Sequence, residues 1–200
     1  MFYPDRKLAG LLALIGGLEC ILGISIAEDL YPSYSVSANY ISDLGATCAR
    51  TSYSFVQPCT IFQPSSIIFT FSVGLLGLLT VATGYLLYRF TKRQILTIFV
   101  LLTGIGALGV AIFPETTGIM HTIVSLVTFL PAGLSAIFSS RILESPVNYL
   151  AILLGALTLL ALVFVFAENY AGLGPGGMER LVAYPALLWL VTFGAYLVKS

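Results

Sequence analysis

Six long apolar segments dominate this chain of 200 residues and constrain its fold more than any other feature. They cover roughly residues 8–27, 66–88, 94–113, 118–139, 147–167 and 180–198. Each is close to the length of about 20 apolar residues that an α-helix needs to cross the hydrocarbon of a bilayer. Two links are very short, RFTKRQ and PETTG, which favours antiparallel neighbours. The sequence therefore predicts an all-α, integral membrane, six-helix up-down bundle, with residues 1–200 forming a single transmembrane domain.

The composition excludes several other classes of protein. Hydrophobic residues make up 58% of the chain and charged residues only 9%, whereas a soluble domain carries about a quarter charged residues. Too little polar surface remains to solvate a globule in water, so the surrounding solvent must be lipid. Nine Lys and Arg residues balance nine Asp and Glu residues, which leaves no basic face for a nucleic acid. The first segment is expected to remain as a helix, because it is too long for a signal peptide and contains Glu19.

Positive charge is distributed unevenly over the links between the segments. Because Lys and Arg concentrate in the short cytoplasmic loops of membrane proteins, both termini are predicted to be cytoplasmic in a multi-pass protein of the cell (plasma) membrane. The longest link, residues 28–64, is then predicted to be an extracellular lid over the outer mouth of the bundle. Seven of the nine Lys and Arg residues flank the cytoplasmic side in this prediction: Arg6, Lys7, Arg89, Lys92, Arg93, Arg141 and Lys199.

Two of the three cysteines, Cys48 and Cys59, lie in this outer loop. An oxidising exterior favours their pairing, so the loop is predicted to be stapled by a structural disulfide. Cys20 lies within the first apolar segment and is predicted to be buried and inert. Earlier in the loop, Ser42 or Asp43 is a candidate cap for a short helix.

Three motifs follow one another along the chain. They are NYISDLGA at residues 39–46, an FPE turn at 113–115 followed by His121, and GGMERLVAYPALLWL at 176–190. In this order and with six spans, the chain resembles the membrane family described as domain of unknown function 998. The resemblance covers essentially the whole chain and implies a polytopic membrane protein of archaea and bacteria, without an agreed activity. The matching positions form an outer polar cluster, which we expect to bind a ligand: Ser42, Asp43, Glu115, His121, Glu179 and Arg180.

Glu115 and His121 have three interpretations. The favoured one is structural: an acid at the start of a helix, where the helix dipole stabilises negative charge, and a histidine at the membrane interface. In the second, Asp43, Glu115 and His121 bind zinc or a similar divalent ion. The chain has only one histidine, which argues against a metal, and no cofactor is predicted. In the third, His121 acts as a general base.

Arg180 follows a glycine-rich turn and has two interpretations. The favoured one is an ion pair with Asp43 and Glu115 that ties the outer loop to the helix ends. In the alternative, the guanidinium and the N–H groups of the turn bind an anion, such as a lipid phosphate of the outer leaflet.

Glu19 lies within the first segment, and an ionisable group at such a depth is a functional candidate. The alternative is a protonated, structural carboxyl bonded to a nearby Ser or Thr. Gly16 and Gly23 share its helical face and would let a neighbouring helix approach closely. The stretch GIGALG at 104–109 fits a dinucleotide-binding pattern, but it lies within a span and follows no strand, so it is predicted to be helix-packing glycine.

These observations favour a non-catalytic protein that binds membrane lipids or serves as an accessory or scaffold subunit of a membrane-protein complex. The alternative is a membrane-embedded lipid-processing hydrolase or transferase that uses His121, Asp43 and Glu115. A second alternative is a small proton-coupled transporter that uses Glu19. The expected partners are membrane lipids and other membrane proteins, and no nucleic acid.

Overall fold

The computed structural model describes residues 3–51 and 54–199, and most of this part of the chain is helical. The six helices are α1 (Tyr3–Asp29), α2 (Ser65–Phe90), α3 (Gln94–Ile112), α4 (Ile119–Ser139), α5 (Val147–Phe166) and α6 (Gly174–Lys199). Each is long and apolar enough to cross a membrane, and each covers one predicted segment. The chain is therefore a multi-pass membrane protein. Helix α6 begins earlier than predicted, because its first turns are glycine-rich and polar and do not register as part of an apolar span.

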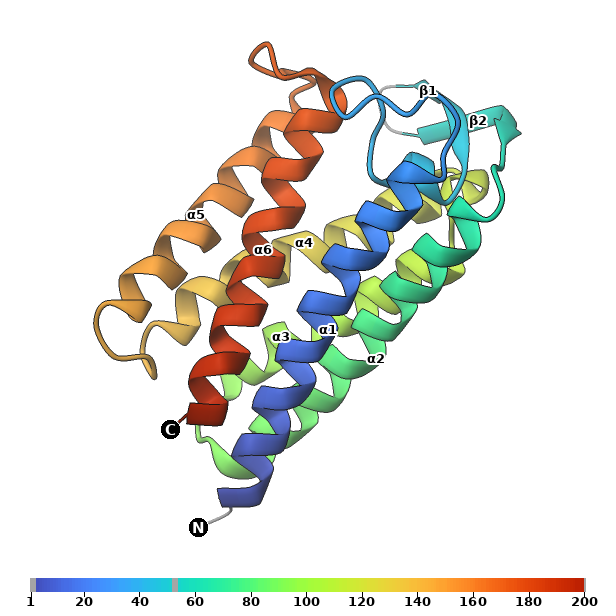
Figure 1. Ribbon diagram of the computed structural model, residues 1–200. Coiled ribbons are helices and arrows are strands. Elements are labelled where there is room, and N and C mark those ends of the chain that lie inside the picture. The colour runs from blue at the N-terminus through green and yellow to red at the C-terminus, as the bar shows by residue number, and fades with distance from the viewer. Residues whose placement is uncertain (1–2, 52–53, 200) are drawn as a thin grey trace.

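The helices close into a ring. Each helix packs against the next one along the chain, α6 packs back against α1, and α4 also contacts α6. The contact between α4 and α6 closes a smaller ring of five helices, α1, α2, α3, α4 and α6. Helix α5 lies outside this five-helix ring and packs against α4 and α6 at the edge of the bundle (Figure 1). The start of α1 and the end of α6 lie at the same end of the bundle (Figure 1).

Glycines mark the closest helix crossings. A Cβ added to Gly104 of α3 would lie 2.9 Å from the carbonyl oxygen of Gly77 in α2, and a Cβ on Gly106 would lie 2.5 Å from the backbone nitrogen of Thr128 in α4. Side chains at these positions would push the helices apart. The GIGALG stretch is therefore helix-packing glycine, as predicted.

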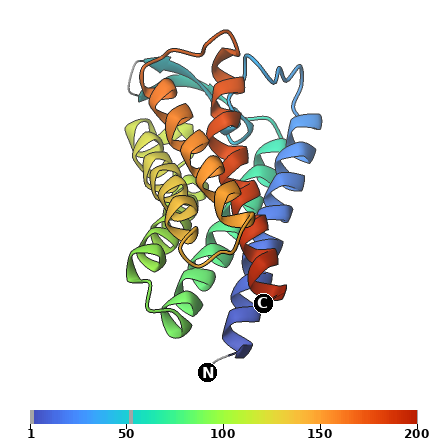
Figure 2. The same ribbon diagram turned by 90° about the vertical axis from the view of Figure 1, so that its left-hand side faces the viewer.

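The segment between α1 and α2, residues 30–64, covers one end of the bundle, and we call it the lid. It contains a 3-10 helix, η1 (Ser42–Leu44), and an antiparallel hairpin of β1 (Thr47–Thr51) and β2 (Ser54–Thr60). Cys48 lies opposite Cys59 in the hairpin, and the two form the predicted disulfide. Figures 1 and 2 show the hairpin at the end of the bundle opposite to the start of α1.

This segment differs from the prediction in two details. The six long helices of the predicted bundle are present, but the Thr, Val and aromatic residues of the lid also form two short strands, as such residues tend to do. Neither Ser42 nor Asp43 caps η1, since its N-cap is Ile41 and both residues lie inside the helix. Their side chains bond elsewhere, as described below.

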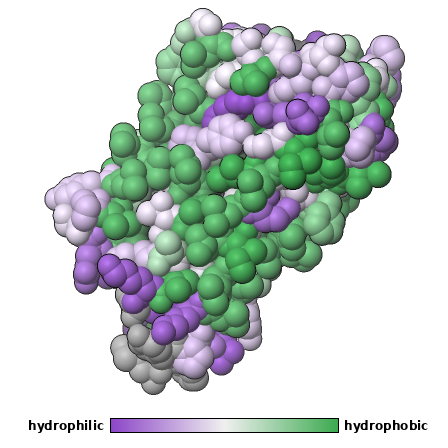
Figure 3. All heavy atoms as spheres, in the orientation of Figure 1, coloured by the Kyte–Doolittle hydropathy of each residue, from purple (hydrophilic) through white to green (hydrophobic). Residues whose placement is uncertain are grey.

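Apolar side chains cover the outer faces of the helices. Leu22, Phe71 and Val163 are 63%, 66% and 65% exposed. Figure 3 shows hydrophobic residues across the middle of the visible face and hydrophilic residues mostly toward its two ends. This distribution fits a protein whose middle is surrounded by hydrocarbon and whose ends meet headgroups and water.

Candidate functional site

The lid is fastened to the N-terminal end of α6 through direct backbone contact. The N–H of Gly176 donates to the carbonyl of Ser37 at 3.0 Å. A Cβ on Gly176 would overlap the carbonyl oxygen of Asn39. Gly174 has a φ of 76°, a conformation that glycine adopts without strain. The glycines of this segment therefore allow the backbone of the lid to lie directly on the helix.

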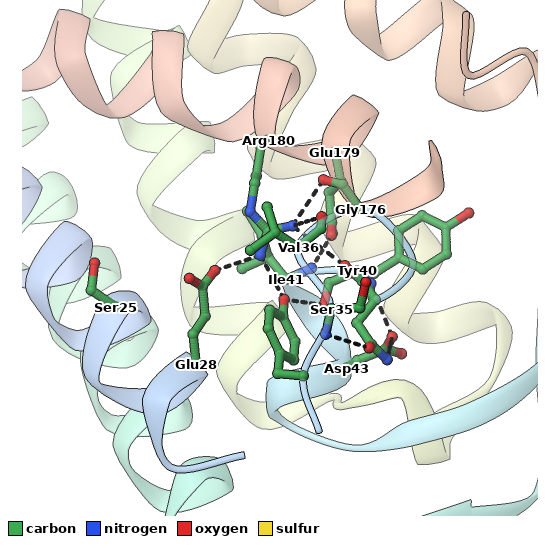
Figure 4. Close-up of polar contacts among 12 residues, drawn as sticks. Ser25, Glu28, Ser35, Val36, Tyr40, Ile41, Asp43, Gly176, Glu179 and Arg180 are labelled. Atoms are coloured by element: carbon green, nitrogen blue, oxygen red, sulfur yellow. Dashed lines mark hydrogen bonds and ion pairs between the residues drawn. The ribbon is translucent and has the colours of Figure 1, made fainter. Parts of the chain in front are cut away.

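Arg180 is the main side-chain anchor of the lid (Figure 4). Its Nη2 donates to Oε1 of Glu28 at 2.5 Å and to the hydroxyl of Tyr34 at 2.7 Å. The ion pair is largely shielded, since the two side chains are 10% and 19% exposed. The other terminal nitrogen, Nη1, donates to three carbonyl oxygens, those of Val36, Asn39 and Gly176, at 2.9, 3.3 and 2.9 Å.

The partner of Arg180 differs from the prediction. Its acid is Glu28 at the end of α1, whereas Asp43 and Glu115 bond to other groups. The predicted task is nevertheless confirmed, because Arg180 ties the lid to α1 and α6. Both terminal nitrogens are engaged within the chain, which argues against the alternative of an anion site on this guanidinium.

Two carboxylates hold the turn that precedes η1 (Figure 4). Oε2 of Glu179 accepts the N–H of Ile41. Oδ2 of Asp43 accepts the N–H of Tyr40 at 2.9 Å and the side-chain amide of Asn39 at 3.1 Å. Burial raises the pKa of Asp43, and these two hydrogen bonds oppose the shift. Both acids therefore accept hydrogen bonds from N–H groups of the NYISDLGA motif that would otherwise be buried without a partner.

Glu115 lies in the short helix η2 (Glu115–Thr117), beneath the hairpin, and is only 1% exposed. Its Oε1 accepts the hydroxyl of Ser42 at 2.7 Å, and its Oε2 accepts the N–H of Cys48 at 3.3 Å. Burial, reinforced by the negative charge of Asp43, raises the pKa of Glu115 to about 8. The carboxyl thus connects the turn between α3 and α4 to both η1 and β1.

His121 lies in the first turn of α4 and is 4% exposed. Its Nδ1 is 2.8 Å from the carbonyl oxygen of Phe113. Because a carbonyl oxygen only accepts, Nδ1 carries the proton, and the neutral ring has Nε2 as its acceptor. The ring meets Phe55 of β2 edge to face, with centroids 5.3 Å apart.

A pocket of about 450 Å³ lies beneath the lid, between α4, α5 and α6, and we call it the lid pocket. Its lining changes from polar to apolar, as the site of an amphiphile would require. Its polar lining includes Tyr40, Ser42, Arg50, His121, Tyr170 and Glu179. Its apolar lining includes Leu126, Phe129, Leu162, Val165 and Phe166.

Arg50 of β1 contributes the positive charge of the lid pocket. Its guanidinium carbon lies 3.7 Å from the ring centroid of Tyr40 and 4.5 Å from that of Phe55. The Tyr40 hydroxyl bonds to that of Tyr170 at 2.7 Å, which holds this ring in place. Among the described residues, Arg50 forms no ion pair with a carboxylate. Aromatic faces therefore hold the cation while leaving its N–H edge available to an anion.

The residues predicted as alternative metal ligands do not form a metal site. Within residues 3–51 and 54–199, no three His, Cys, Asp or Glu side chains are grouped so that they could hold an ion. Asp43 and Glu115 accept hydrogen bonds from the lid itself, and His121 bonds to a carbonyl through one ring nitrogen. The groups that would bind a metal are thus largely used in holding the lid.

The predicted outer cluster is therefore divided between two tasks. Ser42, His121 and Glu179 line the lid pocket, whereas Arg180 anchors the lid. Sequence reasoning missed the pocket residues Arg50, Tyr40, Phe55 and Tyr170. A signal was present for Arg50, which lies between the two disulfide cysteines and is one of only two cations on the predicted outer side.

Glu19 lies apart from this site. It is partly buried on α1 and lines neither the lid pocket nor the deeper cavity described below. The predicted close approach at Gly16 and Gly23 is confirmed, because Cβ atoms there would contact Leu79 and Ser72 of α2. Within the described part of the chain, Oε2 of Glu19 is buried without a hydrogen-bond partner.

Replacing Glu19 with leucine is expected to stabilise the protein. An unpartnered buried polar atom costs roughly 1 kcal/mol or more, which corresponds to a rise in Tm of about 2–4 °C in a chain of this size. Thermal unfolding in detergent measures the change, and Glu19→Gln, which keeps a polar oxygen, serves as the matched control. A fall in Tm for Glu19→Leu would show that the carboxyl has a stabilising partner.

Comparison with known proteins gives one family. A family model described as "Protein of unknown function (DUF998)" matches residues 14–196, which confirms the resemblance stated above. Neither a search of curated proteins nor a search of solved structures gave a match. The comparisons therefore assign a family, and a function has to be argued from the geometry of the chain.

Proposed function

The chain belongs to the DUF998 family of proteins of unknown function, and we propose that it is a non-catalytic lipid-binding protein. Its lid pocket holds the anionic headgroup of a membrane lipid. The observation that carries the proposal is Arg50, a cation that forms no ion pair with a carboxylate among the described residues, at a pocket with an apolar side. A guanidinium bonds to a phosphate through two parallel N–H groups, which makes phosphate the preferred headgroup.

The proposal includes an orientation. The lid faces the exterior of the cell membrane, consecutive helices alternate up and down, and both termini are cytoplasmic. The excess of Lys and Arg in the links opposite to the lid supports this orientation, and so does the Cys48–Cys59 disulfide, which an oxidising exterior favours. The lid pocket then lies at the depth of the outer-leaflet headgroups.

Native mass spectrometry of the protein extracted gently from its own membrane tests the proposal. The wild-type protein is expected to carry a bound phospholipid. Arg50→Gln should lower the occupancy about tenfold or more, because a hydrogen bond to a charged group contributes roughly 1.5–3 kcal/mol. Arg93→Gln removes an exposed charge at the start of α3, far from the lid, and should leave the occupancy unchanged. Equal occupancy in the two variants would refute the proposal.

The same measurement separates the other hypotheses. Co-purification with defined protein subunits, without bound lipid, would favour an accessory or scaffold subunit. The lipid-processing enzyme has one observation in its favour: Nε2 of His121, at the lid pocket, has no hydrogen-bond partner among the described residues. That hypothesis requires turnover of a lipid ester that His121→Gln abolishes without changing lipid occupancy. The transporter hypothesis requires a pH-dependent flux in vesicles that Glu19→Gln removes.

A further inference from the structure

A second cavity lies inside the five-helix ring. It has a volume of about 80 Å³ and is lined by α1, α2, α3, α4 and α6, whereas α5 takes no part. We call it the ring cavity. Five residues line both the ring cavity and the lid pocket, namely Ser42, His121, Ser125, Phe129 and Glu179. The two spaces are therefore neighbours that share a wall beneath η1.

The ring cavity is deep and narrow. It reaches from Ser42 of the lid to Thr80 of α2 and Trp189 of α6. Helix α2 begins at Ser65, and at 1.5 Å per residue Thr80 lies about 22 Å along it. This depth is a large part of the roughly 30 Å of hydrocarbon that a bilayer presents. A cavity of such small volume and such depth is a narrow crevice, which excludes two chains side by side and admits one extended chain only when the helices around it separate slightly.

The walls of the ring cavity are mostly apolar. Ala107, Ala132 and Ala186 contribute small side chains from three different helices, and Trp189 is 2% exposed. The hydroxyls of Thr103 and Thr128 bond to carbonyl oxygens of their own helices, which satisfies them without a ligand. Apolar cavities remain dry and accept apolar guests. Water is therefore a poor occupant of most of this space, and a hydrocarbon chain is a good one.

We propose that the ligand is a phosphate-bearing amphiphile with one hydrocarbon chain in the ring cavity while its phosphate lies against Arg50 in the lid pocket. This inference rests on the proposed function and adds to it a binding site for the hydrocarbon chain of the ligand. Entry requires a slight separation of the ring helices and movement of the shared wall, in which Phe129 is the largest side chain. Since the bilayer already keeps a chain out of water, the chain gains affinity from close packing against the walls of the ring cavity and not from hydrophobic transfer.

Trp189 provides the test, because it is the only tryptophan of the chain and lies at the deep end of the ring cavity. The probe is a single-chain lysophosphatidylglycerol brominated near the end of its chain, titrated into the protein in nanodiscs. Bromine quenches indole fluorescence on contact, so binding should produce saturable quenching of Trp189. The same lipid brominated next to the headgroup should quench several-fold less.

Two cavity-filling variants on helices other than α6 complete the experiment. Ala107→Val and Ala132→Val should each reduce the quenching at least several-fold. Ala156→Leu, which adds apolar volume on the exposed face of α5, should leave it unchanged. Thr80→Val removes a buried hydroxyl that has no partner among the described residues, and it should preserve or tighten binding. Loss of binding in Thr80→Val would overturn the assignment of a hydrocarbon occupant.

The outcomes distinguish this inference from the proposed function. If the lipid binds in an Arg50-dependent way by native mass spectrometry but does not quench Trp189, the headgroup site stands and the chain site is refuted. Quenching that persists in both cavity-filling variants also refutes the chain site. If neither lysophosphatidylglycerol nor glycerol 3-phosphate shows Arg50-dependent binding, both proposals fail.

Discussion

Replacing Arg180 with methionine is expected to release the lid from the bundle and to lower the free energy of unfolding by about 3–5 kcal/mol, the usual cost of breaking a buried ion pair. Methionine preserves much of the side-chain volume but removes every donor. The carboxylate of Glu28 and the hydroxyl of Tyr34 then lose their partner, as do the carbonyls of Val36 and Asn39. Groups left buried without partners account for most of this cost.

Two measurements report the loss in the Arg180→Met protein. The Tm should fall by about 10 °C, and hydrogen exchange should accelerate in residues 30–64 before it does in the helices. Arg93→Met is the matched control, because Arg93 is exposed at the start of α3 and has no part in the lid. Arg180→Lys should recover only part of the loss, since an ammonium cannot reproduce the planar fork of a guanidinium. An Arg180→Met protein as stable as the control would mean that the glycine contacts and the hydrogen bonds of Glu179 and Glu115 hold the lid without Arg180.

The anchoring explains why two of the motifs lie far apart in the sequence and yet belong together. NYISDLGA supplies the backbone groups of the lid, and GGMER supplies the glycines, the acid and the cation that receive them. Glu115 of the FPE turn, the remaining motif, accepts a hydrogen bond from the Ser42 hydroxyl. Most of the polar motif residues therefore fix the lid over the bundle. The cation that we assign to the ligand, Arg50, lies outside all three motifs.

The helices could be predicted from the sequence because crossing a membrane requires a continuous apolar run, which is a local property. The disulfide could be predicted because two cysteines lay in one loop. The partner of Arg180 could not be predicted in the same way. Glu28, Asp43 and Glu115 are all acids assigned to the same side, and the packing of the lid against α1 selects Glu28, which is 152 residues away in the chain.

The hairpin and the pockets were beyond sequence analysis for different reasons. The strands are short, at five and seven residues, and in the sequence their Thr, Val and aromatic residues indicate no more than a loop. The lid pocket depends on how α5 packs against α4 and α6. Hydropathy does not encode that packing, because residues that face lipid, a neighbouring helix or an apolar cavity are equally hydrophobic.

Raising the pH from 6 to 9 is expected to loosen the lid through ionisation of Glu115. Its ordinary pKa of 4.5 is raised to about 8 in the folded chain by burial and by the charge of Asp43. The Ser42 hydroxyl can donate to the carboxylate or accept from the protonated carboxyl, so both forms keep this partner. Since the folded state retains a proton that the unfolded state has lost, high pH favours unfolding.

The sign and the window follow from these two pKa values. Below pH 4.5 the carboxyl is protonated in both states and its stabilising contribution is fully present. Between that pH and about 8, the free energy of unfolding falls by up to about 1.4 kcal/mol per pH unit, and above this window the loss is complete. Asp43, whose pKa burial also raises, adds a dependence of the same sign at the acid end. Hydrogen exchange of residues 40–48, followed from pH 6 to 9 and corrected for the intrinsic rate, should show protection that decreases as the pH rises.

Glu115→Gln isolates the contribution of this carboxyl. Glutamine can replace the protonated carboxyl, because its amide NH2 can donate to the Ser42 hydroxyl oxygen while its carbonyl oxygen accepts the N–H of Cys48. The variant should therefore be about as stable as the wild type at pH 6, and its stability should be nearly independent of pH between 6 and 9, because the titrating group is gone. The test therefore compares how steeply the free energy of unfolding changes with pH in the two proteins, and it does not depend on their absolute stabilities. A variant that keeps the wild-type slope would assign the pH dependence to a group other than Glu115, and would mean that this carboxyl is ionised within the folded lid.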